Sequence, residues 1–154
     1  MKKGYKVVLS ISFVFYLFAL MALLFLGSRG NVWSDLSLIE YIKRSSNFVP
    51  FKTISTYISA IVDGSMNLDI PVKNLIGNFV MFFPMGVYLP FVMKKINTVG
   101  LFAISMIILL FVIEVIQVIT RRGSFDIDDF ILNMIGALLG FTIWKTKIVQ
   151  KLLN

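Results

Sequence analysis

The stretch DIDDFILNMIGALLG, residues 126–140, decides the fold. Within it Asp129, Asn133, Gly136 and Gly140 follow one another at spacings of four, three and four residues. This spacing places side chains on one face of an α-helix. Small residues on such a face let a neighbouring helix approach closely. The stretch therefore predicts a helix that packs against a partner along a stripe of polar and small residues.

The acidic residues at the start of this helix have two compatible interpretations. Asp126 has the position of an N-cap, and Asp129 in the first turn complements the helix dipole. In the functional interpretation, Asp126 and Asp129 lie at the mouth of a cavity and face Arg121 or Arg122.

This helix is the last of four apolar runs. The chain of 154 residues is 58% hydrophobic and only 15% charged, whereas a soluble domain is about 25% charged. We predict an all-α membrane protein, a bundle of four transmembrane helices in a single domain, 1–154. Pro84 and Gly86 predict a kink inside the second helix. The expected membrane helices are 7–26, 75–93, 99–120 and 127–144.

The first run allows a rival interpretation as a signal peptide, because Lys2 and Lys3 form a basic N-terminal region. Residues 7–26 are twenty residues without a charge, enough to span a hydrocarbon core of roughly 30 Å and longer than the apolar region of a signal peptide. The sequence around Gly27 is also a poor cleavage site. An uncleaved anchor is favoured.

Charge placement predicts the orientation and excludes a nucleic-acid partner. The net charge is +7, but the basic residues stand at the ends of the apolar runs, as membrane flanks do and nucleic-acid grooves do not. With the N-terminus in the cytoplasm, the short inner segments carry eight lysines and no acid. Short loops carry the positive-inside signal. Both termini are therefore expected in the cytoplasm and the loop 28–73 outside.

The external loop contains helical patterns. One predicts an amphipathic helix on the outer surface or a re-entrant segment, although a loosely structured loop is the plain alternative. Trp33, Leu36 and Ile39 suggest a second, shorter helix. The apolar residues that share the face of the first helix are Phe51, Ile54, Ile58, Ile61 and Val62.

Several kinds of chemistry are excluded by composition. The chain contains no cysteine and no histidine. Disulfides, thiol catalysis, Cys/His zinc sites and Ser-His-Asp triads are thereby ruled out. We expect no metal site and no cofactor.

Polar residues within the runs predict a site in the outer half of the membrane. Glu114, Gln117 and Arg121 share one helical face, and an ionisable residue in the membrane suggests function. The alternative is that Glu114 only holds helices together. Asn78 and Asn133 lie at similar depth near the outer starts of their helices. We expect Asn78, Glu114, Gln117 and Asn133 to converge in a polar cavity that opens outward.

The order of these residues resembles the VanZ-like membrane protein family. The pattern extends over residues 44–140, and four pieces in order are more specific than any piece alone. The basic pair Arg121-Arg122 is not expected in every member. The matching residues are Arg44, Asn47, Pro50 and Phe51; Asn78, Phe82, Pro84 and Gly86; Glu114 and Gln117; and Asp126, Asp129, Asn133, Gly136 and Gly140.

The resemblance implies a multi-pass protein of the cell membrane of a Gram-positive bacterium, linked to low-level resistance to teicoplanin, a glycopeptide that binds cell-wall precursors. The leading hypothesis is a non-enzymatic protein that binds membrane lipid, a lipid-linked cell-wall precursor or the glycopeptide itself. An intramembrane enzyme is the alternative, with Glu114, Asp126 and Asp129 as acid, base or Mg²⁺ ligands. A transporter ranks low, because four helices are few and no discontinuous repeat is present.

The family pattern also suggests a partner for Glu114. An ionised carboxylate at that depth costs several kcal/mol unless it meets a cation or is protonated. Arginine suits this role because its planar fork donates two hydrogen bonds to a carboxylate. Arg44, which the pattern places beside Asn47, is the first choice of partner, ahead of Arg121 and Arg122.

Overall fold

The computed structural model describes residues 2–26 and 35–153. In these residues the chain is helical throughout, apart from turns, loops and one isolated bridge. In chain order the elements are α1 (Lys2–Met21), the π-helical turn η1 (Ala22–Leu26), α2 (Leu38–Ser45), α3 (Lys52–Asp63), α4 (Asp69–Phe82), α5 (Met85–Val92), α6 (Val99–Ile119), α7 (Ile127–Trp144) and α8 (Lys147–Leu153).

Among the described residues, four helical stretches are long and apolar enough to cross a membrane, which confirms the predicted fold class. α4 and α5 together form the second of them. The stretch begins at Asp69, earlier than the sequence suggested, so that Lys73 lies within α4 and pairs with Asp69 at 3.0 Å. The four stretches are Gly4–Leu26, Asp69–Val92, Val99–Ile119 and Ile127–Trp144.

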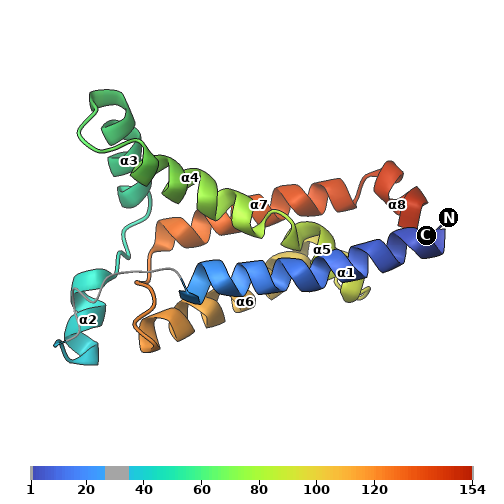
Figure 1. Cartoon of the computed structure of the whole chain (residues 1–154), viewed down its shortest axis with the longest axis horizontal. Helices are drawn as coiled ribbons and strands as arrows, with labels where there is room; N and C mark the ends of the chain where they lie inside the picture. Colours follow the sequence, from blue (N-terminus) through green and yellow to red (C-terminus); the bar gives the residue numbers. More distant parts are fainter. Residues whose placement is uncertain (1, 27–34, 154) are drawn as a thin grey trace.

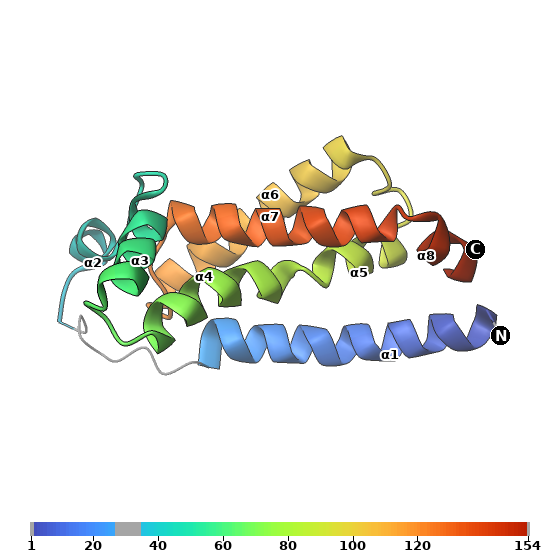
Figure 2. The ribbon, with the colours of Figure 1, turned by 90° about the horizontal axis from the view of Figure 1, so that it is seen from above.

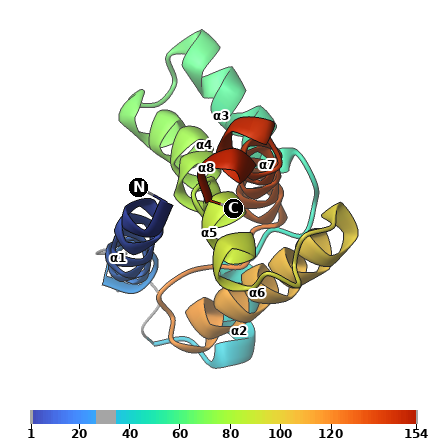
Figure 3. The same ribbon diagram turned by 90° about the vertical axis from the view of Figure 1, so that its right-hand side faces the viewer.

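The arrangement places both chain ends at one end of the bundle and α2 and α3 at the other (Figure 1). Seen from above, α1 runs alongside α4 and α5 over the length of the bundle (Figure 2). Seen along the bundle, α4, α5 and α7 lie together, with α6 on one side and α1 on the other (Figure 3). An even number of spanning helices accounts for the shared end of the termini.

The core is formed where α7 meets α4, α5 and α6. Phe102 of α6 and Phe141 of α7 are almost fully buried, and their rings stack with centroids 4.4 Å apart. Phe82 at the end of α4 is also fully buried. Large aromatic side chains thus fill the space between three of the membrane-spanning stretches.

The small-residue stripe of α7 forms the closest backbone contact. A Cβ atom at Gly136 would overlap the carbonyl oxygen of Phe79, and one at Gly140 would overlap the carbonyl oxygen of Phe83. From the other side, a Cβ at Gly86 would overlap the α7 backbone. The expected close approach along the stripe is confirmed, and it explains why α7 packs directly against α4 and α5.

The second membrane stretch is interrupted where Pro84 was expected to kink it. α4 ends at Phe82 and α5 begins at Met85. Proline has no backbone N–H to donate to the preceding turn, so the regular hydrogen bonding stops there. Bonds from the amides of Val87 and Tyr88 to the carbonyl oxygen of Pro84, each 3.0 Å, start the next helix.

The first membrane stretch is attached by side-chain hydrogen bonds and by a few buried apolar residues. The apolar residues of α1 are largely exposed, although Leu20 of α1 and Leu24 of η1 are buried. Tyr16 donates to the carbonyl oxygen of Met81 at 2.9 Å, and Tyr88 donates to Ser12 at 3.0 Å. α1 therefore has the exposed apolar surface of a helix that faces lipid on most sides.

Both short helices at the far end follow local signals. Ser37 and Glu40 form a capping box at the start of α2, and the Ser37 hydrogen bonds lower the pKa of the Glu40 carboxyl. Of the residues expected in the shorter helix, Ile39 lies in α2, Leu36 precedes it, and Trp33 lies outside the described residues. α3 covers the predicted amphipathic segment and leaves Ile58 and Val62 exposed.

Candidate functional site

The segment between α2 and α3 is attached to the start of α7 by backbone hydrogen bonds. The amide of Asn47 donates to the carbonyl oxygen of Phe125 at 2.8 Å. The amide of Ile127 donates in turn to the carbonyl oxygen of Asn47 at 3.0 Å. These two bonds form a parallel bridge between Asn47 and Asp126. Residues far apart in the sequence are thereby fixed side by side.

Asp126 fills the predicted N-cap position and also binds across the junction. Its Oδ1 accepts the amide of Asp128 at 2.9 Å, which confirms the cap. The same oxygen accepts from Asn47 Nδ2 at 3.1 Å, and Oδ2 accepts from the Thr53 hydroxyl at 2.7 Å. Both carboxylate oxygens of Asp126 are thus occupied by hydrogen bonds that hold the junction together.

Asp128 is one of two residues at this junction that were not predicted from the sequence. Its side chain is fully buried. Oδ1 accepts the amide of Phe51 at 2.5 Å, and Oδ2 accepts the amides of Thr53 and Ile54 at 2.7 and 3.1 Å. These amides are the otherwise unsatisfied donors at the N-terminus of α3. A carboxylate from α7 therefore caps α3 from outside the helix, where the dipole of α3 favours a negative charge.

No sequence signal pointed to Asp128, because its partners are backbone amides. Phe51 at the N-cap of α3 has a positive φ of 64°, and its own side chain makes no cap hydrogen bond. We call the group formed by these side chains the junction cluster; its members are Asn47, Thr53, Asp126 and Asp128. Thr53 was also missed, since a threonine at a helix start has an ordinary capping interpretation.

Deeper in the bundle, the stripe of α7 binds α4 through side chains. Asn78 of α4 donates to Asp129 Oδ1. Asn133, one turn further along α7, is 5% exposed, and its Oδ1 has no hydrogen bond within the described residues. Buried polar atoms are nearly always hydrogen-bonded. A bound group could therefore supply the donor that this oxygen lacks.

The polar pair on α6 lies in the interior. Glu114 is 6% exposed and Gln117 is 4% exposed. Gln117 Nε2 donates to the carbonyl oxygen of Leu24 at 2.9 Å. Leu24 belongs to the π-helical turn η1, where the regular hydrogen-bonding register changes. Gln117 thus connects α6 to the end of the first membrane stretch.

The three arginines of the predicted site lie at the surface near α2. Arg121 donates to the carbonyl oxygen of Leu36 at 2.7 Å, and its guanidinium lies 5.8 Å from the centre of the Tyr41 ring. Arg44 is exposed in the last turn of α2, and Arg122 is exposed after α6. The pairing of Arg44 with Glu114 stays a prediction.

The structure therefore groups the predicted residues in two places. Asn47 and Asp126 meet in the junction cluster, and Asn78 meets Asp129 between α4 and α7. Convergence of Asn78, Glu114, Gln117 and Asn133 in one cavity stays a prediction. Within residues 2–26 and 35–153, no group of three acidic side chains is placed to hold a metal ion.

An apolar pocket of about 300 Å³ lies between α2 and α6, near the end of the bundle that carries α2 and α3. Ile42 and Phe48 line it on one side, and Phe111 and Val115 line it on the other. The hydroxyl of Ser46, which also lines the pocket, has no hydrogen bond within the described part of the chain. Such a lining suits an alkyl chain better than a polar molecule.

Comparison with known proteins gives one family and one relative. The family model described as VanZ/LLP1 matches residues 13–150. A curated relative, "Protein VanZ" from Enterococcus faecium, is 29% identical over 129 residues, which cover 84% of this chain and 68% of the relative. No solved structure matches the chain.

Proposed function

Since the chain belongs to the VanZ/LLP1 family, we propose that it is a multi-pass membrane protein that lowers the susceptibility of the cell to teicoplanin-like glycopeptides. It acts without catalysis, by binding a lipid-linked component of the cell wall or a membrane lipid. The site lies in the half of the bundle that carries α2 and α3.

The observation that carries this proposal is the presence of buried polar groups in α6 and α7 together with an apolar pocket between α2 and α6. Glu114, Gln117 and Asn133 are buried in helices that lead toward α2 and α3, and the Asn133 carbonyl oxygen is available to a ligand. The pocket between α2 and α6 suits an alkyl chain. A polar head with an apolar tail is the chemistry of a lipid-linked precursor, and also of a glycopeptide with an acyl tail.

The enzymatic alternative is weakened by the roles of the acidic residues. Both oxygens of Asp126 accept hydrogen bonds from the junction cluster, and Asp129 accepts from Asn78. A general acid or base must be within reach of the substrate proton that it transfers. Side chains that fix helices to one another are poorly placed for this task.

The direct test is native mass spectrometry of the protein after gentle extraction from its own membrane. A lipid-linked cell-wall precursor bound at one copy per protein would support the proposal. Turnover of that precursor by the purified protein would favour the enzymatic alternative, and binding of neither precursor nor lipid would contradict the proposed role.

The proposal includes an orientation, with both chain ends in the cytoplasm and α2 and α3 outside. Single cysteines can be introduced into this cysteine-free chain as Asp63→Cys and Lys95→Cys. We expect an impermeant thiol reagent to label position 63 in intact cells and position 95 only after lysis, because short lysine-rich segments stay in the cytoplasm. Labelling in the reverse order would overturn the orientation.

Glu114→Gln tests the buried carboxylate of the site. The amide keeps the shape of the side chain but removes its charge, so a ligand or cation held by the carboxylate is released. We expect the protective effect against teicoplanin to be lost while membrane abundance stays nearly unchanged. Susceptibility of an expressing strain and immunoblots of its membranes measure the two quantities.

Asp69→Asn is the matched control for this variant, since Asp69 is an exposed carboxylate in α4. It should leave both protection and abundance intact. A Glu114→Gln protein that is scarce in the membrane would instead show that Glu114 holds helices together. Full protection by a normally abundant Glu114→Ala variant would remove Glu114 from the site.

A further inference from the structure

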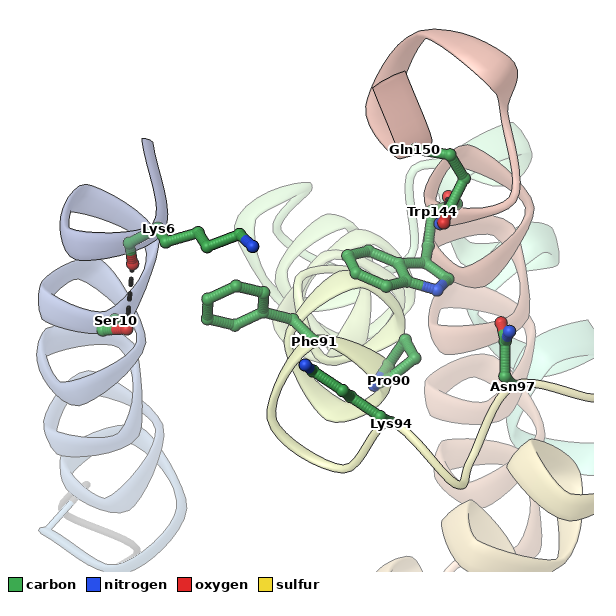
Figure 4. Close-up of a pocket in the computed structure, with 8 residues that line it drawn as sticks. All are labelled: Lys6, Ser10, Pro90, Phe91, Lys94, Asn97, Trp144 and Gln150. Atoms are coloured by element: carbon green, nitrogen blue, oxygen red, sulfur yellow. Dashed lines mark hydrogen bonds between the residues drawn. The ribbon is translucent and has the colours of Figure 1, made fainter. Parts of the chain in front are cut away.

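A second pocket, of about 470 Å³, lies at the end of the bundle that carries both chain ends. Its walls come from α1, α5, the segment between α5 and α6, α7 and α8 (Figure 4). The volume is in the range of about 300–1,000 Å³ that is typical of small-ligand pockets. The pocket is at the opposite end from the site proposed above.

The pocket is basic, and no acidic side chain compensates its charge. Lys6 of α1 and Lys94 after α5 both line it, and their side chains extend from different elements into the space beside Phe91 (Figure 4). The sequence contains no aspartate or glutamate in residues 1–34, 70–113 or 130–154, which include all the pocket walls. Two ammonium groups facing one space without a counter-charge attract an anion.

The wall formed by α7 supplies a buried donor. Trp144 is 8% exposed, and its indole Nε1 has no hydrogen bond within the described residues. The indole ring packs edge-on against Phe91, with ring centroids 6.4 Å apart. Burying an N–H group without an acceptor is costly. In Figure 4 the indole nitrogen lies on the side of the ring toward Asn97, so an oxygen of an anionic ligand in that part of the pocket would provide the acceptor, while the lysines attract its charge.

We infer that this pocket binds the phosphate headgroup of an anionic phospholipid. The lipid belongs to the leaflet on the side of the membrane where both chain ends lie. The pocket lies at the ends of membrane-spanning stretches, where headgroups are found. Val8 of α1 and Val92 of α5, which are close in sequence to pocket residues, are exposed apolar residues along which acyl chains can pack. Basic pockets between membrane helices are typical sites for such headgroups.

The proposal predicts selective binding of phosphatidylglycerol over phosphatidylcholine by the purified full-length protein in neutral detergent. Native mass spectrometry of titrations with lipids of matched acyl chains measures the two affinities. We expect Lys94→Gln to weaken phosphatidylglycerol binding about fivefold, and the double variant Lys6→Gln/Lys94→Gln about thirtyfold. Trp144→Phe, which removes the N–H donor but keeps an aromatic ring in the wall, should weaken binding about tenfold.

Lys95→Gln is the matched control, because Lys95 is the exposed neighbour of Lys94 and does not line the pocket. It should leave the affinity for phosphatidylglycerol nearly unchanged. Equal losses in Lys94→Gln and Lys95→Gln, or no preference for phosphatidylglycerol, would overturn the inference. Inorganic phosphate that binds the wild type as tightly as the lipid does would show that the pocket takes a free anion, which also overturns it. Size-exclusion profiles identical to that of the wild type verify that each variant is folded.

Discussion

Gly136→Ala is expected to give a protein that barely accumulates in the membrane. The added methyl group would overlap the carbonyl oxygen of Phe79, a backbone atom that cannot turn aside. α7 and α4 would have to separate, and the contacts around both helices would loosen with them. We expect a loss of stability of about 3 kcal/mol, the upper part of the range for overpacked positions.

Gly77→Ala is the control, because Gly77 also lies in α4 and a Cβ there meets no atom within 4 Å. Alanine at this position should leave stability unchanged or raise it by about 0.5–1 kcal/mol, since glycine is the poorer helix former. Thermal midpoints in detergent and immunoblots of membranes measure both variants. Equal abundance of the two proteins would show that α7 and α4 do not pack as closely as described.

Asp128→Ala is expected to release α3 from the bundle. Three backbone amides at the start of α3 would lose their charged acceptor, and a hydrogen bond to a charged group contributes about 1.5–3 kcal/mol. Asp128→Asn should be almost as damaging, because its NH₂ group would point at a backbone donor. Hydrogen exchange is the measurement, with rapid exchange expected at residues 51–54 in both variants and slow exchange in the wild type.

Asp63→Ala serves as the control at the other end of α3. Asp63 is exposed, and the pKa of its carboxyl group is lowered by hydrogen bonding to the side chain of Ser65 and to the amide of Ser65, which donates to the carboxylate at 2.9 Å. Its loss should leave exchange at residues 51–54 slow. Slow exchange in Asp128→Ala as well would mean that α3 is held by its packing on α4 and α7 and not by the buried carboxylate.

The sequence predicted the elements whose signals are local. The four membrane stretches follow from length and apolarity, and the N-cap at Asp126 follows from its position before an apolar helix. The break at Pro84 follows from the missing N–H of proline. The close approach at Gly136 and Gly140 follows from their helical spacing, which places two residues without side chains on one face of α7.

Contacts in which a side chain binds a backbone group could not be predicted from the sequence. Asp128 binds amides of α3 and Gln117 binds the carbonyl oxygen of Leu24, and neither partner carries a side-chain signature. The π-helical turn at the end of the first stretch has no recognisable sequence signal either. The matched depth of Asn78 and Asn133 predicted polar groups on neighbouring helices, but the pairing of Asn78 with Asp129 required the structure.

The sparse attachment of α1 has a consequence for the order of synthesis. α1 and η1 leave the ribosome before the other described helices, yet the groups that bind them, on Met81, Tyr88 and Gln117, are made much later. Its exposed apolar residues let it remain in lipid as an independent helix during this interval. We therefore expect assembly to end with a lateral docking step, in which α1 joins a bundle already formed by α4, α5, α6 and α7.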